Sequence, residues 1–197
     1  MENKKKGLLI VLSGPSGVGK GTVRKIIFKN ESLNLAYSIS MTTRSPRKKE
    51  QDGVDYFFVS KEEFEERLEK DLFLEHAYFV GNHYGTPKEY VEELRNQGKN
   101  VFLEIEVEGA KQVLSKCKGE DVISIFLLPP SLQELERRIR GRKSETEEII
   151  QERLEKARRE INLKENYEYS VMNENVGKAA NEISRIIKAR MKKLNLK

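Results

Sequence analysis

A chain of 197 residues has the length of one ordinary domain and can bury a sizeable core without disulfides or a structural metal. Its single cysteine, Cys117, and its two histidines exclude an intramolecular disulfide and a Cys/His zinc cluster. The net charge of +5 favours anionic partners, whether nucleotides, nucleic acid or a membrane surface. No apolar run approaches the roughly 20 residues of a membrane span, so we expect a protein of the reducing cytoplasm.

Apolar runs of strand length alternate with helical patterns along the chain. Residues 7–13 are almost continuously apolar and precede a helical pattern at 22–29. Further apolar runs at 101–107 and 122–128 are each followed by a helical pattern, as a parallel sheet covered by helices requires. The sequence therefore predicts an α/β fold with a parallel β-sheet core flanked by helices.

The alternation of apolar runs and helical patterns is interrupted between Ser38 and Tyr90. A basic turn there leads into a short aromatic segment, a helix from about Lys61 to Lys70, and an aromatic stretch that contains glycine. We interpret this region as an insertion of small mixed α/β structure with a sheet of its own.

Helical patterns dominate the rest of the chain. After two prolines, residues 131–142 and 149–160 predict a pair of arginine-rich helices joined by a polar turn, an arrangement suited to a lid. The C-terminal segment predicts a helix whose apolar face packs against the sheet. That face carries Ile183, Ile186, Ile187, Met191 and Leu194.

We expect one domain over residues 5–190. Its core would consist of 5–37, 91–136 and 159–190, with the insertion at 38–90 and the lid at 137–158.

Residues 14–20, GPSGVGK, fit the pattern G-x-x-x-x-G-K between a predicted strand and a predicted helix. Glycines let backbone N–H groups converge on an anion at the helix N-terminus, and Lys20 can reach β- and γ-phosphate oxygens. The pattern usually continues with Ser or Thr, which helps to hold Mg²⁺, but here Gly21 precedes Thr22. We predict a P-loop, with Thr22 as the candidate magnesium ligand. The predicted ATP-binding residues of the loop are Gly14, Pro15, Ser16, Gly17, Val18, Gly19, Lys20, Gly21 and Thr22.

Several ordered blocks of the sequence resemble guanylate kinases. The resemblance continues through the predicted lid and covers nearly the whole chain. It implies a P-loop fold with a GMP-binding insertion and a helical lid, which transfers the γ-phosphoryl group of ATP to GMP, and also to dGMP, with Mg²⁺ as cofactor. The blocks are SISMTTRSPR (38–47), GVDYFFVS (53–60), FLEHAYFVGNHYGTP (73–87) and LEIEVEGA (103–110).

Two arginines in the basic turn are candidates for binding a phosphate. Arg44 and Arg47 lie three residues apart, and guanidinium groups bind phosphate in a bidentate manner. The resemblance implies that they hold the GMP phosphate together with the hydroxyls of Tyr56 and Tyr84. From the residues alone, a solvated basic turn stays open as the alternative.

Glu75 follows three apolar residues, an unusual place for a carboxylate that has no partner. Guanine presents N1–H and N2–H₂ side by side, a donor pair that one carboxylate can accept and that adenine lacks. We therefore predict that Glu75 selects guanine, and the resemblance adds Ser40 and Thr86 to the guanine contacts. A solvent contact at a helix end is the alternative.

Glu104 and Glu106 alternate within the predicted strand 101–107. Both side chains should therefore point to one face near its C-terminal end, where ligands of open α/β sheets bind. The resemblance implies contacts with GMP. Because the family commonly has Asp at position 106, the partner of Glu106 stays open between the acceptor, the metal and an arginine. A solvent-facing edge strand is the alternative.

The predicted lid carries further cations. Arg138 and Arg142 lie four apart on one predicted helix, and Arg153 lies on the next. The resemblance implies that these arginines close over ATP and that Asn173 adds a contact on the ATP side. The predicted catalytic residues are Lys20, Arg44, Arg138, Arg142 and Arg153.

The expected reaction needs positioning and charge neutralisation more than a general base. The acceptor phosphate is already largely ionised at neutral pH, because its second pKa is about 6. Three other functions stay open: a P-loop kinase for another small acceptor, a non-catalytic guanylate-kinase-like module that binds proteins, and RNA binding, for which no module is recognisable. We expect no nucleic-acid or membrane partner, and a monomer and a homo-oligomer are equally compatible with the sequence.

Overall fold

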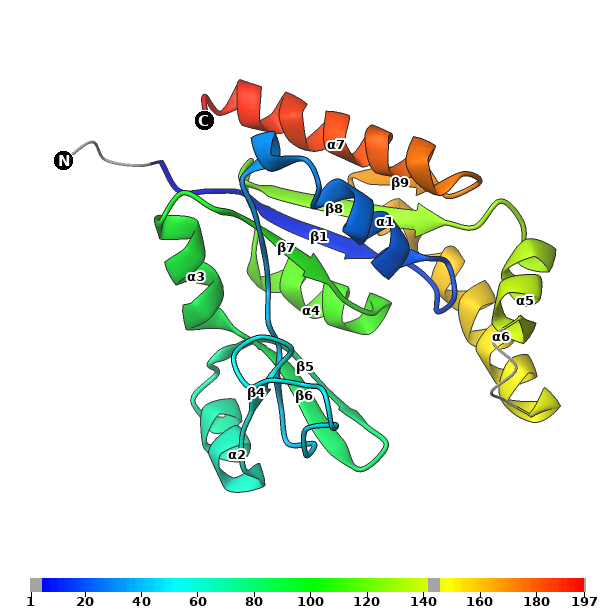
Figure 1. Ribbon diagram of the computed structural model, residues 1–197, viewed down its shortest axis with the longest axis horizontal. Coiled ribbons are helices and arrows are strands. Elements are labelled where there is room, and N and C mark those ends of the chain that lie inside the picture. The colour runs from blue at the N-terminus through cyan, green and yellow to red at the C-terminus, as the bar shows by residue number, and fades with distance from the viewer. Residues whose placement is uncertain (1–4, 142–145, 197) are drawn as a thin grey trace.

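The computed structural model describes residues 5–141 and 146–196 (Figure 1). Its central sheet has five strands, and every neighbouring pair is parallel. The predicted parallel α/β core is therefore confirmed. In spatial order the strands are β2 (Leu35–Tyr37), β7 (Asn100–Glu104), β1 (Leu9–Ser13), β8 (Val122–Leu128) and β9 (Tyr169–Met172).

Both faces of this sheet are buried, which explains why β1 reads as an unbroken apolar run. Successive side chains of a strand point to opposite faces, so Ile10 and Leu12 enter one hydrophobic cluster while Leu9 and Val11 enter another. Helices α1 (Lys20–Ile27) and α7 (Val176–Lys193) supply side chains to the first cluster. Helices α3 (Lys88–Asn96) and α4 (Val107–Lys116) supply the second, on the other side of the sheet (Figure 1).

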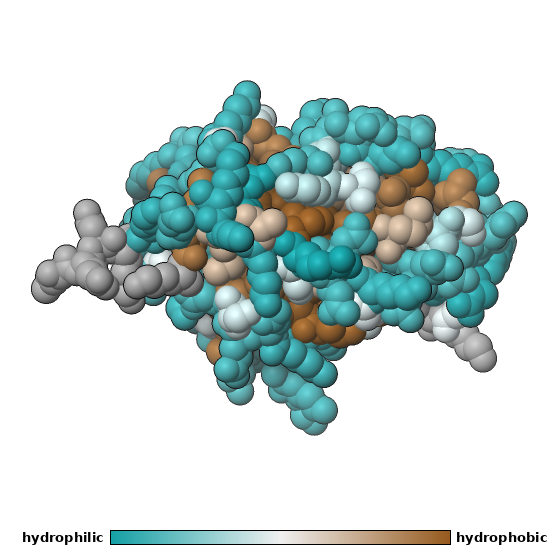
Figure 2. Space-filling view, turned by 90° about the horizontal axis from the view of Figure 1, so that it is seen from above, coloured by the Kyte–Doolittle hydropathy of each residue, from teal (hydrophilic) through white to brown (hydrophobic). Residues whose placement is uncertain are grey.

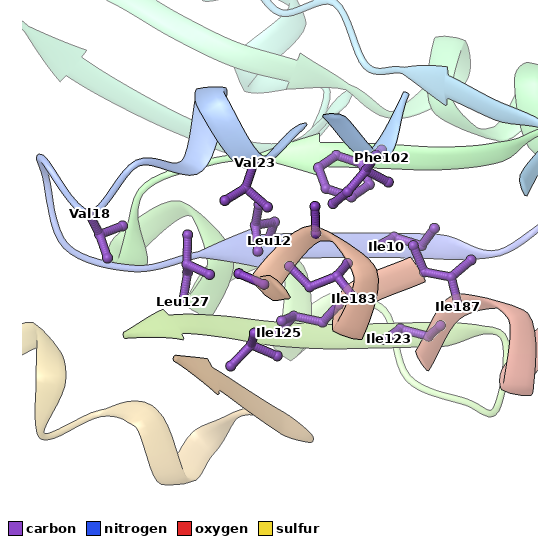
Figure 3. Packing of buried hydrophobic residues seen from close by; sticks show 14 of the residues in the cluster. Ile10, Leu12, Val18, Val23, Phe102, Ile123, Ile125, Leu127, Ile183 and Ile187 are labelled. Atoms are coloured by element: carbon purple, nitrogen blue, oxygen red, sulfur yellow. The ribbon is translucent and has the colours of Figure 1, made fainter. Parts of the chain in front are cut away.

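The predicted apolar face of the C-terminal helix is confirmed. Ile183 and Ile187 are fully buried and Met191 is nearly so. Figure 3 shows Ile183 and Ile187 among the buried side chains of β1 and β8. Ile186 and Leu194 are partly buried against the same cluster.

The two helices after β8 also pack on the core. Helix α5 (Leu132–Arg140) begins at the N-cap Ser131, whose hydroxyl accepts from the Glu134 N–H, and α6 (Glu147–Ile161) follows it. Leu135 and Leu154 add to the cluster beneath α7. The helix pair is as predicted, except that α5 ends at Arg140, before the expected residue 142, and Arg142 lies outside the described residues.

A second, smaller sheet lies apart from the first (Figure 1). Helix α2 (Lys61–Glu69) covers it, and the ring of Phe64 stacks on that of Phe73 with 4.4 Å between centroids. Strands β3 and β4 are parallel, while β3–β6 and β5–β6 are antiparallel. The insertion thus carries its own mixed sheet, as predicted. In spatial order it consists of β4 (Phe57–Phe58), β3 (Met41–Thr42), β6 (Asn82–Pro87) and β5 (Phe73–Phe79).

Short 3₁₀ helices at Glu31–Leu33 and Lys164–Asn166 complete the regular structure of the described residues. In that part of the chain, no helix is both long and apolar enough to span a membrane. Seen from above, the surface is largely hydrophilic, with hydrophobic side chains visible between the charged ones (Figure 2).

Because the apolar face of α7 is buried, we expect substitutions on that face to lower the free energy of unfolding. Replacement of Ile183 with alanine should lower the free energy of unfolding by about 2–5 kcal/mol, because it removes apolar contacts and leaves a cavity. Urea unfolding followed by circular dichroism measures the loss. The exposed residue Arg185 on the same helix provides the control, and Arg185→Ala should change stability by less than about 0.5 kcal/mol. Equal losses in both variants would contradict the assigned packing of α7.

Candidate active site

The phosphate loop, residues 14–19, connects β1 to α1 at the carboxyl edge of the central sheet. Gly14, Gly17 and Gly19 have φ angles of 146°, 85° and 102°, which L side chains rarely adopt. A Cβ at Gly14 would also lie 2.4 Å from the carbonyl oxygen of Leu127. Only glycine therefore lets the loop turn tightly against β8 and place its N–H groups at the start of α1.

Lys20 folds back into this loop. Its ammonium donates to the carbonyl oxygens of Gly14 at 2.5 Å and Pro15 at 3.3 Å. Burial lowers the pKa of Lys20, while the nearby carboxylates of Glu104 and Glu160 act in the opposite direction. The lysine is thus already positioned at the place where a phosphate would enter.

A cavity of about 500 Å³ opens above the loop. One wall consists of the loop and the first turns of α1, and the other consists of the turn after β7 and of α6. The wall formed by the loop and α1 carries basic side chains, and the opposite wall carries three glutamates and a lysine. The lining residues are Gly14, Ser16, Gly17, Gly19, Lys20, Gly21, Thr22, Arg24, Lys25, Glu104, Ile105, Glu106, Lys156 and Glu160.

Two predicted site residues support the loop from behind. Asn173 is 1% exposed, and its side-chain amide donates to the Val18 carbonyl oxygen at 2.7 Å. Arg138 donates to the carbonyl oxygens of Val18 at 3.2 Å and Asn173 at 3.0 Å. The structure thus places the amide of Asn173 against the loop backbone, and its contact on the ATP side stays a prediction.

The other predicted lid arginines differ in their placement. Arg153 on α6 reaches the loop, where its guanidinium donates to the Ser16 hydroxyl at 3.5 Å. Arg142 lies outside the described residues, so its predicted role stays a prediction.

In the small sheet, Arg44 is held by a carboxylate that the sequence analysis did not single out. Its Nη2 donates to both carboxylate oxygens of Glu50 at 2.9 Å, and the Arg47 backbone N–H donates to Glu50 Oε2 at 2.8 Å. Desolvation works against the charge of Arg44, but hydrogen bonds with Glu50 and Tyr84 outweigh it and raise the pKa of this arginine. The backbone hydrogen bond from Arg47 and the guanidinium of Arg44 lower the pKa of Glu50.

Aromatic rings lie next to the ion pair of Arg44 and Glu50. The guanidinium of Arg44 lies 5.4 Å from the ring centroid of Tyr56, within the range of a cation–π contact. The rings of Tyr56 and Tyr84 meet edge to face with 6.2 Å between centroids. The structure thus brings three of the predicted phosphate-binding residues together, with the Arg47 backbone beside them.

Glu75 on β5 is 7% exposed and lies under α4. The Thr86 hydroxyl donates to its Oε1 at 2.5 Å, and a Cβ at Gly109 would lie 2.8 Å from its Oε2. Burial raises the pKa of Glu75, although the hydrogen bond from Thr86 acts against this. Glu75 and Thr86 are therefore brought together as predicted. Ser40 lies between β2 and β3, where its carbonyl oxygen accepts from the Phe57 N–H.

The prediction that Glu104 and Glu106 share one strand is wrong. Strand β7 ends at Glu104, and Glu106 is the N-cap of α4. The chain must leave the strand there because the next helix begins at Val107, which is buried. As a result the two carboxylates have different partners: Glu104 accepts from Arg24 at 2.7 Å, and Glu106 pairs with Lys156 on α6 at 2.8 Å.

Glu106 also connects the two halves of the site. Its charge acts on the pKa of both Lys20, at the start of α1, and Glu75 on β5 of the small sheet. Lys20 and Glu75 thus both lie within electrostatic range of the turn between β7 and α4.

Several charged residues of the site, among them Glu50, Glu160, Arg24 and Lys156, were not predicted from the sequence. Two had a visible signal: Glu50 is an acid at the end of a basic turn, and Glu160 lies three residues after the buried Ala157, on the apolar face of α6. Arg24 and Lys156 had none, because a lysine or arginine on a charged helix is normally solvated.

The chain is similar to known proteins over nearly its whole length. A family model described as guanylate kinase matches residues 6–190. Curated guanylate kinases of Mesoplasma florum and Mycoplasma capricolum subsp. capricolum are each 55% identical to the chain over 93% of its length, and the chain spans 61% of theirs. A crystal structure of guanylate kinase from Anaplasma phagocytophilum is 36% identical, with a TM-score of 0.71 over 94% of this chain and 87% of that one.

The burial of Glu75 makes stability depend on pH. The pKa of Glu75 is raised above the ordinary value of 4.5 in the folded, ligand-free protein. The contribution of Glu75 to the free energy of unfolding is therefore fully present below pH 4.5 and is lost as the pH rises through the raised pKa. Glu75→Gln should therefore gain stability relative to the native protein between pH 4 and pH 8, by about 1.4 kcal/mol for each unit by which the pKa is raised. Urea unfolding at several pH values measures the difference.

The control for this series is Glu69→Gln, which removes one negative charge from an exposed position. Its stability should stay within about 0.5 kcal/mol of the native protein. A difference between Glu75→Gln and native protein that does not vary with pH would contradict the assigned burial of this carboxylate.

Proposed function

The chain belongs to the guanylate kinase family, and from that membership we propose that it transfers the γ-phosphoryl group of ATP to GMP, with dGMP as a further acceptor. The single observation that carries the proposal is the buried pair of Glu75 and Thr86, 2.5 Å apart, in a chain that also carries a phosphate loop. Such a pair suits guanine, whose two adjacent donors a carboxylate can accept. We place the reaction in the reducing cytoplasm, since a chain with one cysteine needs no oxidising compartment.

On the ATP side, the loop N–H groups and Lys20 would hold the phosphates. Lys20 now donates to two backbone carbonyl oxygens, and an incoming phosphate would replace them with a stronger, charge-assisted partner. Arg138 and Asn173 would keep the loop in shape from behind, because both hold the Val18 carbonyl oxygen. Arg153, which already touches Ser16, would supply positive charge on the lid side, and Arg142 is proposed for the same role.

On the acceptor side, Arg44 and Arg47 would bind the GMP phosphate, with Tyr56 and Tyr84 beside it. Glu50 would act as a positioning residue, since it fixes Nη2 of the Arg44 guanidinium, while Nη1 donates to the Ser45 carbonyl oxygen at 2.7 Å. Glu75, in its ionised form, would accept from N1–H and N2–H₂ of guanine, with Thr86 and Ser40 completing the contacts.

These residues perform phosphoryl transfer by positioning. No general base is needed, because the acceptor phosphate is largely ionised at neutral pH. Lys20 and the arginines would neutralise the negative charge that spreads over the transferring oxygens. We propose that the insertion, 38–90, and the lid, 137–158, close over the substrates and exclude water that would otherwise hydrolyse ATP.

The cavity also fits magnesium bound together with ATP. Thr22, Glu104 and Glu106 offer the oxygen atoms that this hard cation prefers, around the space above Lys20. Within the described residues, no group of three or more His, Cys, Asp or Glu side chains is arranged to hold a metal by itself. Mg²⁺ usually shares its coordination with substrate phosphates and water, and it would supply charge neutralisation on those phosphates.

The proposal is tested by a coupled assay with ATP, Mg²⁺ and each of GMP, AMP, CMP and UMP. We expect GDP formation from GMP, and a value of kcat/KM for AMP lower by about 10⁴-fold, because adenine leaves the buried carboxylate of Glu75 without its donors. The Lys20→Ala variant, purified in the same way, should be inactive and so excludes a contaminating kinase. Equal turnover of GMP and AMP, or none of GMP, would refute the assignment.

Arg44 provides a second test on the acceptor side. Arg44→Ala should lower kcat/KM for GMP by about 10²–10³-fold while the affinity for ATP stays unchanged, because the arginine lies in the small sheet and not at the phosphate loop. Steady-state kinetics and nucleotide titration measure the two quantities. Lys48→Ala is the matched control, as it removes an exposed cation from the same turn. A parallel loss of ATP affinity would contradict the role of Arg44.

A further inference from the structure

One face of α4 holds the outer edge of β5 on both sides of Glu75. On the C-terminal side, the His76 N–H donates to Gln112 Oε1 at 3.0 Å, and Gln112 Nε2 donates to the His76 carbonyl oxygen at 2.9 Å. On the N-terminal side, the ammonium of Lys116 donates to the Phe73 carbonyl oxygen at 2.9 Å. Gln112 and Lys116 lie four residues apart on the helix and therefore share one face. The backbone that carries Glu75 is thus held between two side chains of α4.

Strand β5 is not fixed at Glu75 by its own sheet. It is an edge strand, so β6 pairs with only one of its sides. The register between the two strands also shifts here, because Phe73 faces Pro87 while Glu75 already faces Thr86. Two steps along β5 therefore match one step along β6, with Leu74 as the extra residue of a β-bulge. A bulge interrupts the ladder and changes the direction of the side chains beside it.

The side-chain amide of Gln112 takes the place of a neighbouring strand. It offers one donor and one acceptor, as a peptide group does, and it uses both on His76. The N–H that it binds belongs to the peptide group between Glu75 and His76, from which the carboxylate of Glu75 projects. On the same helix, a Cβ at Gly109 would lie 2.8 Å from Glu75 Oε2, so the carboxylate fills the space that the glycine leaves.

We propose that Gln112 is a positioning residue that makes the acceptor site selective for guanine. This inference rests on the proposed function and deepens it, because it names a residue that determines the choice of base through the backbone of β5. Gln112 holds the peptide group after Glu75, so that the carboxylate meets both N1–H and N2–H₂ of the base. Without the amide, the bulge lets the carboxylate shift, and a shift of about 1 Å is enough to spoil a paired hydrogen bond.

The test compares two acceptors that differ in one donor. IMP keeps N1–H but lacks the N2 amino group of GMP, so the ratio of their dissociation constants measures how well Glu75 binds the second donor. Gln112→Met keeps the length of the side chain and removes both hydrogen bonds to His76. It should weaken GMP binding by about thirtyfold and IMP binding by about threefold, because a hydrogen bond to a charged group is lost only with GMP. Titrations followed by nuclear magnetic resonance, without ATP, measure both.

A double-mutant cycle shows whether Gln112 acts through Glu75. In protein that already carries Glu75→Gln, the further change Gln112→Met should weaken GMP binding by less than about threefold, because the carboxylate that it positions is gone. Should Gln112→Met fail to fold, Gln112→Asn keeps the amide but withdraws it by one methylene. The same fall in the ratio of IMP to GMP dissociation constants is expected.

Two controls separate this role from support of the fold. Gln97→Met makes the same replacement at an exposed position after α3, and its ratio should equal that of the native protein. Ile183→Ala lowers stability from the far side of the central sheet. Its ratio should also be unchanged, because a ratio of two affinities does not depend on the fraction of protein that is folded.

Two results would overturn the proposal. One is an equal weakening of GMP and IMP in Gln112→Met, which would show that the residue only supports the fold. The other is a thirtyfold loss of GMP affinity that persists in the presence of Glu75→Gln. These measurements need no turnover, so an absence of GDP formation by the native protein would count against the proposed function alone. Equal binding of GMP and IMP by the native protein would refute the role of Glu75 itself, and this inference with it.

Discussion

The close approach of the phosphate loop to β8 is the constraint on which the rest of the site depends. The chain leaves β1 at Gly14, where a Cβ would lie 2.4 Å from the Leu127 carbonyl oxygen, and it turns through two further positive φ angles before α1 begins. Because β1 is the middle strand of a sheet buried on both faces, it cannot shift to relieve a larger residue. The rigid sheet therefore fixes the loop, and the loop fixes Lys20.

Ion pairs hold the cations of the site before any substrate arrives. Arg44 is held by Glu50, Arg24 by Glu104 and Lys156 by Glu106, while Arg138 is shared between Glu134 and the loop backbone. Long side chains lose much rotamer freedom when they bind an anion, and a carboxylate that orients them beforehand reduces this cost. The same carboxylates keep several positive charges close together without strong mutual repulsion.

The two halves of the site meet around α4. Its Gly109 leaves room for the carboxylate of Glu75, and its N-cap Glu106 pairs with Lys156 of α6. The side-chain amide of Gln112, also on α4, hydrogen-bonds the N–H and the carbonyl of His76 on β5. One helix thus ties the small sheet to the central sheet and to the helix that follows the lid turn, and movement of either part must act through these contacts.

The parallel α/β core, the phosphate loop, the separate sheet of the insertion and the buried face of α7 could all be predicted from the amino-acid sequence. Each of these rests on local chemistry: continuous apolar runs for strands buried on both faces, glycine spacing for the loop, and helical periodicity for Ile183 and Ile187. That Glu75 has a partner was also within reach, because a carboxylate after three apolar residues needs one, but the hydrogen bond from Thr86 was found only in the structure.

Which charged side chains pair with one another became known only from the folded chain. The sequence placed Glu104 and Glu106 on one strand, but helix α4 begins too soon for that, so one carboxylate turns to α1 and the other to α6. It gave no sign that the amide of Asn173 would be buried beneath the loop and would hold the Val18 carbonyl oxygen. Such partners come from elements up to 155 residues apart in the chain. No local pattern encodes them, because the same lysine, glutamate or asparagine would be equally stable in water until the fold brings a partner within reach.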